Sequence, residues 1–269
     1  MTQKVVFITG ASSGIGLAIA HHLHQKGYKV FGTSRNPEKI KQDIPFTLLS
    51  LDVNDTESIS QAVETLLKQT GRIDVLINNA GKGIAGPLEE IPEAEMKAVF
   101  DTNFFGPIRM IKAVLPSMRS QKKGLVINIT SIAGYMGLPF RGVYSATKGA
   151  LALVTESINM ECRQHGIRFV NIAPGDFATN IASGRYHVPL QDYSPYRKGY
   201  QTSLEMMNTH VDAGGDPSDV AKMVHKIIEN KNPKINYKAA VFTEKMGIVL
   251  KRLLPDNVYE KMLMKHFKL

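Results

Sequence analysis

Short apolar segments alternate with segments of helical periodicity through most of this chain. The first apolar segment, residues 4–9, is too hydrophobic to be exposed on either face. Others follow at residues 28–33, 46–51, 73–77, 125–129 and 168–172, with helix-period sequence between most of them. Such alternation is typical of a parallel sheet that is covered by helices. We therefore predict a doubly wound α/β fold whose ligand lies beyond the carboxyl ends of the strands.

A glycine-rich turn joins the first predicted strand to the helix after it. Glycine lets the backbone turn sharply, and it lets a pyrophosphate approach a helix N-terminus, where free N–H groups favour negative charge. The glycine spacing differs from the G-x-G-x-x-G fingerprint, but the position between a buried strand and an amphipathic helix indicates a dinucleotide site. The turn reads Thr9-Gly10-Ala11-Ser12-Ser13-Gly14-Ile15-Gly16. We expect the cofactor to contact Gly10, Ser12, Ser13, Gly14, Ile15 and Gly16.

The end of the second predicted strand indicates which dinucleotide binds. NAD sites of this kind place an acidic residue there, whereas an arginine accommodates the additional phosphate of NADP. This chain has Ser34 and Arg35 at that point and no acid. Their hydroxyl and guanidinium can pair with a phosphate dianion, which favours NADP(H); the alternative is a surface arginine after a strand. Asp52, followed by Val53, can accept a hydrogen bond from adenine or serve only as a turn residue.

Composition excludes several classes of protein. The 269 residues are 43% hydrophobic and 21% charged, which is enough for one large core. The single cysteine, Cys162, can form no intramolecular disulfide and leaves no thiol pair for zinc, so we expect no metal site and a cytoplasmic location. The apolar run near the N-terminus is too short for a signal peptide, and no segment approaches the roughly 18–20 apolar residues of a membrane span.

The net charge of +9 is compatible with several partners. Nucleic acid, an anionic membrane surface or a phosphate-rich ligand can each attract a basic protein, but a solvated basic surface is the simpler interpretation. No basic stripe with interleaved aromatic residues is present, so we expect no binding to nucleic acid.

Tyr144 and Lys148 form the candidate catalytic pair. Their spacing of four residues at a predicted helix start places both side chains on one face, so that their polar ends approach the same point. Tyrosine is ordinarily a poor acid at neutral pH, and an adjacent ammonium favours its phenolate. Such a tyrosine can exchange a proton with a substrate oxygen. Ser131 follows the fifth predicted strand, where its hydroxyl can hold a carbonyl oxygen.

Together these motifs resemble the short-chain dehydrogenase/reductase family from residue 1 to about residue 228. The matches, in the family's order and spacing, are the glycine-rich turn, Asn78-Asn79-Ala80-Gly81, Asn103, Ser131, Tyr144 with Lys148, and Pro174-Gly175 with Thr179. The resemblance implies a Rossmann-type fold and an oxidoreductase that moves hydride between a nicotinamide and a carbonyl or secondary alcohol. It also implies a homodimer or homotetramer built from the helices around residues 104–118 and 144–163.

The resemblance also implies a role for each matched residue. Tyr144 is the acid and base, Ser131 positions the substrate oxygen, and Lys148 both tunes Tyr144 and holds the nicotinamide ribose. Asn103 anchors a water in a proton relay to Lys148, although from the residues alone it is equally well explained as a helix cap. The cofactor contacts implied outside the glycine-rich turn are Asn79, Ala80, Gly81, Tyr144, Lys148, Pro174, Gly175 and Thr179.

Substrate specificity is expected to depend on residues 83–91, 132–142 and 176–216. The last segment lacks clear periodicity, which predicts either a binding loop with short helices or a mobile lid. The apolar character of these segments suggests a hydrophobic substrate. Beyond its motifs the chain is similar to the steroid- and retinol-dehydrogenase-like branch and, less closely, to ketosphinganine reductases. The alternative is a non-enzymatic NADPH-binding regulator, against which the complete catalytic set argues.

The segment after residue 243 lies outside the family's common motifs. We therefore predict a Rossmann-fold domain at residues 1–243 and a basic amphipathic extension at residues 244–269. Two helices separated by Pro255 are expected, and their apolar positions are Met246, Val249, Leu250 and Leu253, then Val258, Met262 and Leu263. Such helices can pack on the substrate loop or a partner subunit, or lie on an anionic membrane. We expect the extension to help close the substrate cleft, with peripheral membrane contact as a secondary role.

Overall fold

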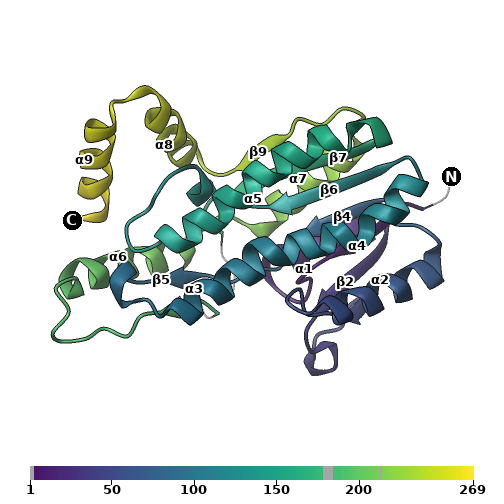
Figure 1. Ribbon diagram of the computed structural model, residues 1–269, viewed down its shortest axis with the longest axis horizontal. Coiled ribbons are helices and arrows are strands. Elements are labelled where there is room, and N and C mark those ends of the chain that lie inside the picture. Colours follow the sequence, from purple (N-terminus) through teal and green to yellow (C-terminus); the bar gives the residue numbers. More distant parts are fainter. Residues whose placement is uncertain (1–2, 178–183, 213) are drawn as a thin grey trace.

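The computed structural model describes residues 3–177, 184–212 and 214–269. At its centre lies a seven-stranded parallel sheet with the order β3-β2-β1-β4-β6-β7-β9 (Figure 1). The strands are β1 (Val5–Ile8), β2 (Lys29–Ser34), β3 (Thr47–Ser50), β4 (Val75–Asn78), β6 (Gly124–Ile129), β7 (Ile167–Pro174) and β9 (Asn236–Ala239). The strand order reverses between β1 and β4, so the carboxyl ends of the strands open a crevice there.

Helices cover both faces of this sheet. On one face α1 (Gly14–Gln25) packs against α7 (Pro217–Glu229), and both share a core with Val6 and Ile8 of β1. On the other face α2 (Thr56–Thr70), α4 (Gly106–Ser120) and α5 (Gly142–Glu161) cover Phe7 and Phe169 (Figure 1). Burial from both sides is the reason that the central strand β1 is continuously apolar.

All the apolar segments predicted as strands lie in this sheet, and the doubly wound fold is confirmed. The pattern does not mark β9, because Asn236–Ala239 contains polar residues and pairs with the sheet only along β7. An edge strand of this kind is held by its backbone ladder and by local polar contacts. One such contact is the hydrogen bond that the side-chain amide of Asn171 donates to the Asn236 side chain at 3.1 Å.

Residues 176–216 contain regular structure in their described part. β8 (Tyr186–His187) pairs in parallel with β5 (Ile84–Ala85), and α6 (Arg197–Asp212) follows. Tyr200 of α6 is fully buried, and its hydroxyl donates a hydrogen bond to the Ala85 carbonyl at 2.9 Å. These contacts anchor α6 on the loop after β4. The prediction of only short helices in this segment is wrong, since α6 has 16 residues.

Two helices form the C-terminal extension, as predicted. α8 (Phe242–Leu253) packs against η4, the 3₁₀ turn Ile132–Tyr135, and α9 (Asp256–Phe267) contacts α6 and α8 (Figure 1). The predicted apolar sides are wrong in part: Val249, Leu253 and Val258 are exposed, whereas Ile248 and Tyr259 are buried. Helical spacing defines a face, but the position of η4 and α6 decides which face is covered. Within the described ranges, no helix has both the length and the apolar character needed to cross a membrane.

Candidate active site

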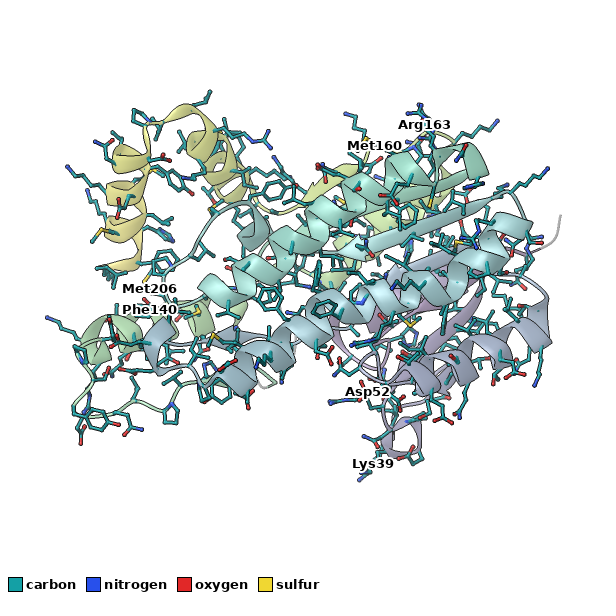
Figure 2. All side chains as sticks on the ribbon, in the orientation of Figure 1. Lys39, Asp52, Phe140, Met160, Arg163 and Met206 are labelled. Atoms are coloured by element: carbon teal, nitrogen blue, oxygen red, sulfur yellow. The ribbon has the colours of Figure 1, made fainter. Side chains whose placement is uncertain are left out.

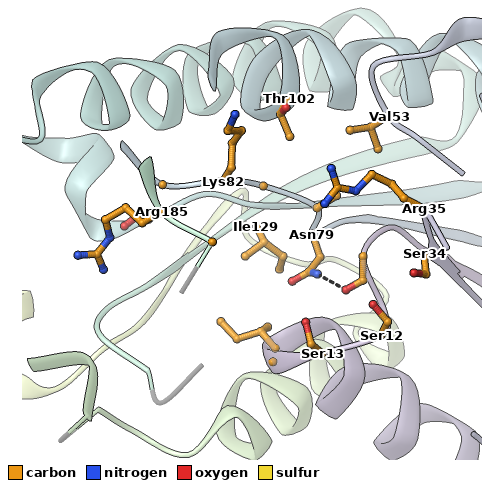
Figure 3. Close-up of a pocket in the computed structure, with 18 of the residues that line it drawn as sticks. Ser12, Ser13, Ser34, Arg35, Val53, Asn79, Lys82, Thr102, Ile129 and Arg185 are labelled. Carbon is orange, nitrogen blue, oxygen red and sulfur yellow. Dashed lines mark hydrogen bonds between the residues drawn. The ribbon is translucent and has the colours of Figure 1, made fainter. Parts of the chain in front are cut away.

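A cleft of about 780 Å³ opens at the carboxyl ends of the strands, where the fold predicts a ligand site. Figure 3 shows Ser34 and Arg35 at one end of this cleft and Arg185 at the other. Of the site residues predicted from the sequence, Thr179 lies outside the described residues, and Gly16 and Asn103 lie behind the lining. All the others line the cleft.

The glycine-rich turn lines the same cleft as Ser34 and Arg35. Gly10 and Gly14 have positive φ angles of 65° and 53°, which glycine adopts without strain. Gly16 has no room for a Cβ, because the Gly10 backbone and the Asn79 side chain lie against it. The N-cap residue Ser13 makes no side-chain cap bond, and the first turn of α1 contains no acid. The first N–H groups of α1 are therefore available to an anion such as a pyrophosphate.

Thr9 joins the loop after β4 to this turn. Its hydroxyl accepts hydrogen bonds from the N–H groups of Asn79 and Ala80, each at 3.0 Å. The side-chain amide of Asn79 donates to the carbonyls of Thr9 and Gly10, also at 3.0 Å; Figure 3 shows one of these bonds. These bonds hold the two loops together as one wall of the cleft.

Positive charge gathers beyond the end of β2. Arg35 is exposed and lines the cleft, and so does Lys39, which no sequence pattern marks (Figures 2 and 3). Lys39 comes close because the 3₁₀ turn Pro37–Lys39 follows the strand. Asp52 accepts the N–H of Asn54 at 2.9 Å, so it does act as a turn residue while it also lines the cleft.

Ser131, Tyr144 and Lys148 line the same cleft. Tyr144 and Lys148 lie near the start of α5 and are only 8% and 5% exposed. The Lys148 Nζ donates to the Ile129 carbonyl at 3.0 Å and lies 5.9 Å from the centroid of the Tyr144 ring. Ser131 follows β6, and its Oγ accepts the N–H of Ala133 at 3.1 Å. Sheet and helix thus bring together the three side chains that the sequence predicted as one group.

A close backbone approach keeps Ser131 beside α5. η4 begins directly after Ser131, and its Gly134 lies against the backbone of Lys148 and Gly149. A Cβ at position 134 would collide with that backbone. Glycine at this contact therefore helps to set the position of Ser131 relative to Lys148.

Comparison with known proteins agrees with this geometry. Residues 4–187, more than half of the chain, match the family model described as short chain dehydrogenase. The chain belongs to the short-chain dehydrogenase/reductase family. This confirms the resemblance of the motifs and makes the protein a member of a family of oxidoreductases.

Relatives of this short-chain dehydrogenase match it over most of its length. 3-Ketodihydrosphingosine reductase of Bacteroides thetaiotaomicron is 38% identical and covers 97% of this chain and 96% of its own. Retinol dehydrogenase 8 of Bos taurus is 34% identical, and the match covers 86% of this chain and 80% of the relative. A solved short-chain dehydrogenase from Streptomyces avermitilis has a TM-score of 0.83 at 30% identity, covering 100% and 97%. An alcohol dehydrogenase from Thermococcus sibiricus, solved with 5-hydroxy-NADP, has a TM-score of 0.70 at 28% identity, covering 89% and 96%.

Asn103 lies within a continuous helical path and is not a helix cap. α3 (Glu93–Phe100) runs through a π-helical turn (Asp101–Phe105) into α4. The side chain of Asn103 is buried; it accepts the N–H of Lys82 and donates to the Lys82 carbonyl, both at 2.9 Å. It also donates to the Thr147 hydroxyl at 3.3 Å. In this short-chain dehydrogenase, Asn103 therefore holds the loop after β4 against α5, and π turns are frequent at functional sites.

Glu244 is a contact of the short-chain dehydrogenase site that the motifs do not predict. Its carboxylate accepts the N–H of Asp176 at 3.0 Å and the N–H of Val241 at 2.9 Å. A Cβ at Gly175 would occupy the place of this carboxylate. A glutamate at the third position of a helix often accepts its own cap N–H, which is the local signal. The bond to Asp176 crosses 68 residues and links the extension to the Pro174-Gly175 turn.

Two guanidiniums line the end of the cleft that contains Tyr144, where the sequence suggested mainly apolar character. Arg141 precedes α5, and its guanidinium carbon lies 5.3 Å from the centroid of the Tyr144 ring. Arg185 precedes β8 and is 9% exposed. Both line the cleft. Apolar side chains are also present nearby, since Phe140 packs on Tyr200 with ring centroids 5.3 Å apart.

Proposed function

We propose that this protein uses NADPH to reduce a ketone or an aldehyde, or NADP to oxidise the corresponding alcohol. The observation that supports this most directly is the presence of Ser131, Tyr144 and Lys148 in the cleft that also contains the glycine-rich turn. When bound, the nicotinamide supplies or accepts the hydride. The chain's own residues bind the dinucleotide, hold the reacting oxygen and move one proton.

Tyr144 is the acid and base of the proposed reaction. Its hydroxyl gives a proton to the oxygen of the carbonyl under reduction and takes the proton back in the reverse direction. The Oγ of Ser131 already accepts the N–H of Ala133, so its own hydrogen can be donated to the same substrate oxygen. The ammonium of Lys148 has three donors and uses one on Ile129. The others can stabilise negative charge on Tyr144 and bind the nicotinamide ribose.

Asn103 is proposed to support a proton relay through its backbone. Its side-chain amide already bonds the N–H and the carbonyl of Lys82, so a relay water would have to bind the backbone carbonyl of Asn103 instead. Asn103 and Lys148 both lie against Gly81, so the relay has a short distance to cross. Pro174 and Gly175 are proposed to contact the nicotinamide, and Thr179 its carboxamide or the pyrophosphate.

Preference for NADPH is proposed from the charge beyond β2. Arg35 and Lys39 line that end of the cleft, with the Ser34 hydroxyl beside them. The structural neighbour from Thermococcus sibiricus was solved with an NADP derivative, which is consistent with this choice. Asp52 and Val53 would then border the adenine.

The substrate is proposed to be largely hydrophobic, such as a steroid-, retinoid- or lipid-like carbonyl compound. Ile84 and Tyr144, which line the cleft, belong to a buried apolar cluster that continues behind the lining to Tyr200. The names of two relatives, a ketodihydrosphingosine reductase and a retinol dehydrogenase, support the same class of substrate.

The proposed activity is tested by following NADPH oxidation with a panel of ketones, aldehydes, steroids, retinoids and long-chain acyl ketones. We expect turnover of at least one hydrophobic carbonyl compound. A regulator that binds NADPH without catalysis is the alternative function. It predicts tight NADPH binding and no turnover of any compound in the panel.

Self-association is expected through the outer surfaces of α4 and α5. Leu153 and Met160 of α5 are 69% and 71% exposed, and Phe105, in the π-helical turn that leads into α4, is also exposed; Figure 2 shows Met160 on the outside. Exposed large apolar side chains on neighbouring helices favour a subunit interface. We predict a dimer or tetramer by light scattering at micromolar concentration, and a smaller species for Leu153→Glu with Met160→Glu. The same change at exposed Leu253 is the control, and a monomeric wild type would contradict the prediction.

The extension from residue 244 is proposed to close the substrate end of the cleft, since α8 contacts η4 and α9 contacts α6. Deleting residues 244–269 should raise KM for bulky apolar substrates much more than for small ketones. The deletion removes both the helices that cover the cleft and the hydrogen bond between Glu244 and Asp176. Glu244→Ala separates these two losses, because it removes the bond but leaves both helices. We expect it to weaken NADPH binding with little dependence on substrate size.

The outcome that excludes a role in the cleft is a folded truncation with unchanged KM for every substrate. Attachment to an anionic membrane is the secondary role, to which the exposed Lys261, Lys265 and Lys268 would contribute. Flotation with anionic liposomes, compared with neutral liposomes, tests it separately.

A further inference from the structure

Arg185 is held in a fixed position beside the catalytic residues. The N–H of Tyr186 donates to the Gly83 carbonyl at 3.1 Å, and β8 then pairs with β5. The aliphatic part of Arg185 packs over Gly83, where a Cβ would collide with it. The guanidinium therefore lies on the wall of the cleft as part of the folded scaffold (Figure 3).

The charge of Arg185 is not neutralised within the described part of the chain. Its guanidinium makes one weak contact, 3.8 Å from the Met207 sulfur, and no described carboxylate forms an ion pair with it or with Arg141. Burial lowers the pKa of Arg185, and the like charge of Arg141 lowers it further. Tyr144, Asp176 and Tyr200 act in the opposite direction without cancelling these effects. A buried guanidinium without a counterion is costly, and an anionic ligand would relieve that cost.

We propose that the substrate carries an anionic oxygen group, a carboxylate or a phosphate, which Arg185 and Arg141 bind while its carbonyl group lies at Ser131 and Tyr144. The proposal rests on the proposed carbonyl reduction and narrows its substrate class. A guanidinium presents a planar set of donors that matches both anions, often through two parallel hydrogen bonds. Arg141 lies against the ring of Tyr144, so the anion would bind near the reacting carbonyl. The apolar remainder of the substrate would then lie against the apolar part of the cleft lining, which includes Ile84 and Phe177.

The test compares carbonyl substrates of equal chain length that differ only in charge. They are a straight-chain oxo acid, its methyl ester, the corresponding oxoalkyl phosphate and the corresponding amino ketone. We expect kcat/KM for at least one anion to exceed that for the ester by about tenfold or more, the gain of a hydrogen bond to a charged group. The cationic amino ketone should be the poorest substrate. Whichever anion has the larger advantage identifies the group that the site prefers.

Three variants assign this preference to Arg185. Arg185→Met should remove most of the advantage of the anion over the ester, and Arg185→Lys should retain part of it. Arg163→Met is the matched control, because Arg163 is exposed at the far end of α5 (Figure 2). NADPH affinity should stay unchanged in all three, which shows that each variant is folded.

Two results separate this inference from the proposed function. If wild type reduces ester and anions equally well, or if Arg185→Met slows both equally, the anion site is wrong and the proposed reduction stands. Calorimetric titration of the NADP-loaded protein with a fatty acid that lacks a ketone or aldehyde group measures anion binding without turnover. Binding that depends on Arg185, together with no turnover of any carbonyl compound, would support the anion site and refute the proposed reduction.

Discussion

Tyr144→Phe is expected to lower kcat by about 10²–10⁴-fold, the usual contribution of a general acid or base. Phenylalanine keeps the ring that packs beside Arg141 and Lys148, so only the proton-transferring hydroxyl is lost. NADPH affinity should therefore remain close to that of wild type. Single-turnover kinetics with saturating NADPH, combined with an equilibrium titration of the cofactor, measures both quantities.

Two further variants make this experiment specific. Ser131→Ala should also lower kcat more than it lowers NADPH affinity, because its hydroxyl is proposed to bind substrate and not cofactor. Tyr28→Phe is the matched control, since this substitution removes only a hydrogen bond to Glu229. Tyr28 directly precedes β2 and so lies at the amino ends of the strands, away from the cleft at their carboxyl ends. A Tyr144→Phe enzyme that keeps half the wild-type rate would rule out the proposed acid and base.

Arg35→Ala is expected to weaken NADPH binding roughly 10- to 150-fold and to leave NADH binding almost unchanged. The reason is the loss of a charge-assisted pair with the additional phosphate, which is worth about 1.5–3 kcal/mol. Arg35 is exposed and makes no contact with the catalytic residues, so kcat at saturating cofactor should change little. Equilibrium titrations at one ionic strength give the dissociation constants of NADPH and NADH for the wild type and for Arg35→Ala, and these constants are then compared.

Substitutions at two neighbouring positions also test the proposed preference for NADPH. Ser34→Asp should shift preference towards NADH, because a carboxylate repels the phosphate and can accept the ribose hydroxyls. Lys39→Ala should produce a smaller loss of NADPH affinity than Arg35→Ala, since Lys39 offers a point charge without the guanidinium fork. Equal affinity of the wild type for NADPH and NADH would contradict the proposal.

Local sequence patterns by themselves determined most of the fold and the core of the candidate site. The sheet strands β1, β2, β3, β4, β6 and β7 follow from apolar runs, because a strand buried on both faces has little tolerance for polar residues. The turn at Gly10 and Gly14 requires positive φ angles, which only glycine adopts readily, so its place is visible in the sequence. Tyr144 and Lys148 are four apart on one helix, and helical geometry alone places them together.

Contacts between distant segments were decided only by the tertiary structure. Arg141 and Arg185 converge because β8 pairs with β5 beside the start of α5, and Glu244 reaches Asp176 because α8 packs on η4. The polar strand β9 forms because β7 offers a free edge. The covered face of α8 is likewise selected by its neighbours, which bury Ile248 and leave Leu253 exposed. Helical and strand periodicity are properties of a few adjacent residues, whereas these positions depend on free energy gained when segments far apart in the chain pack together.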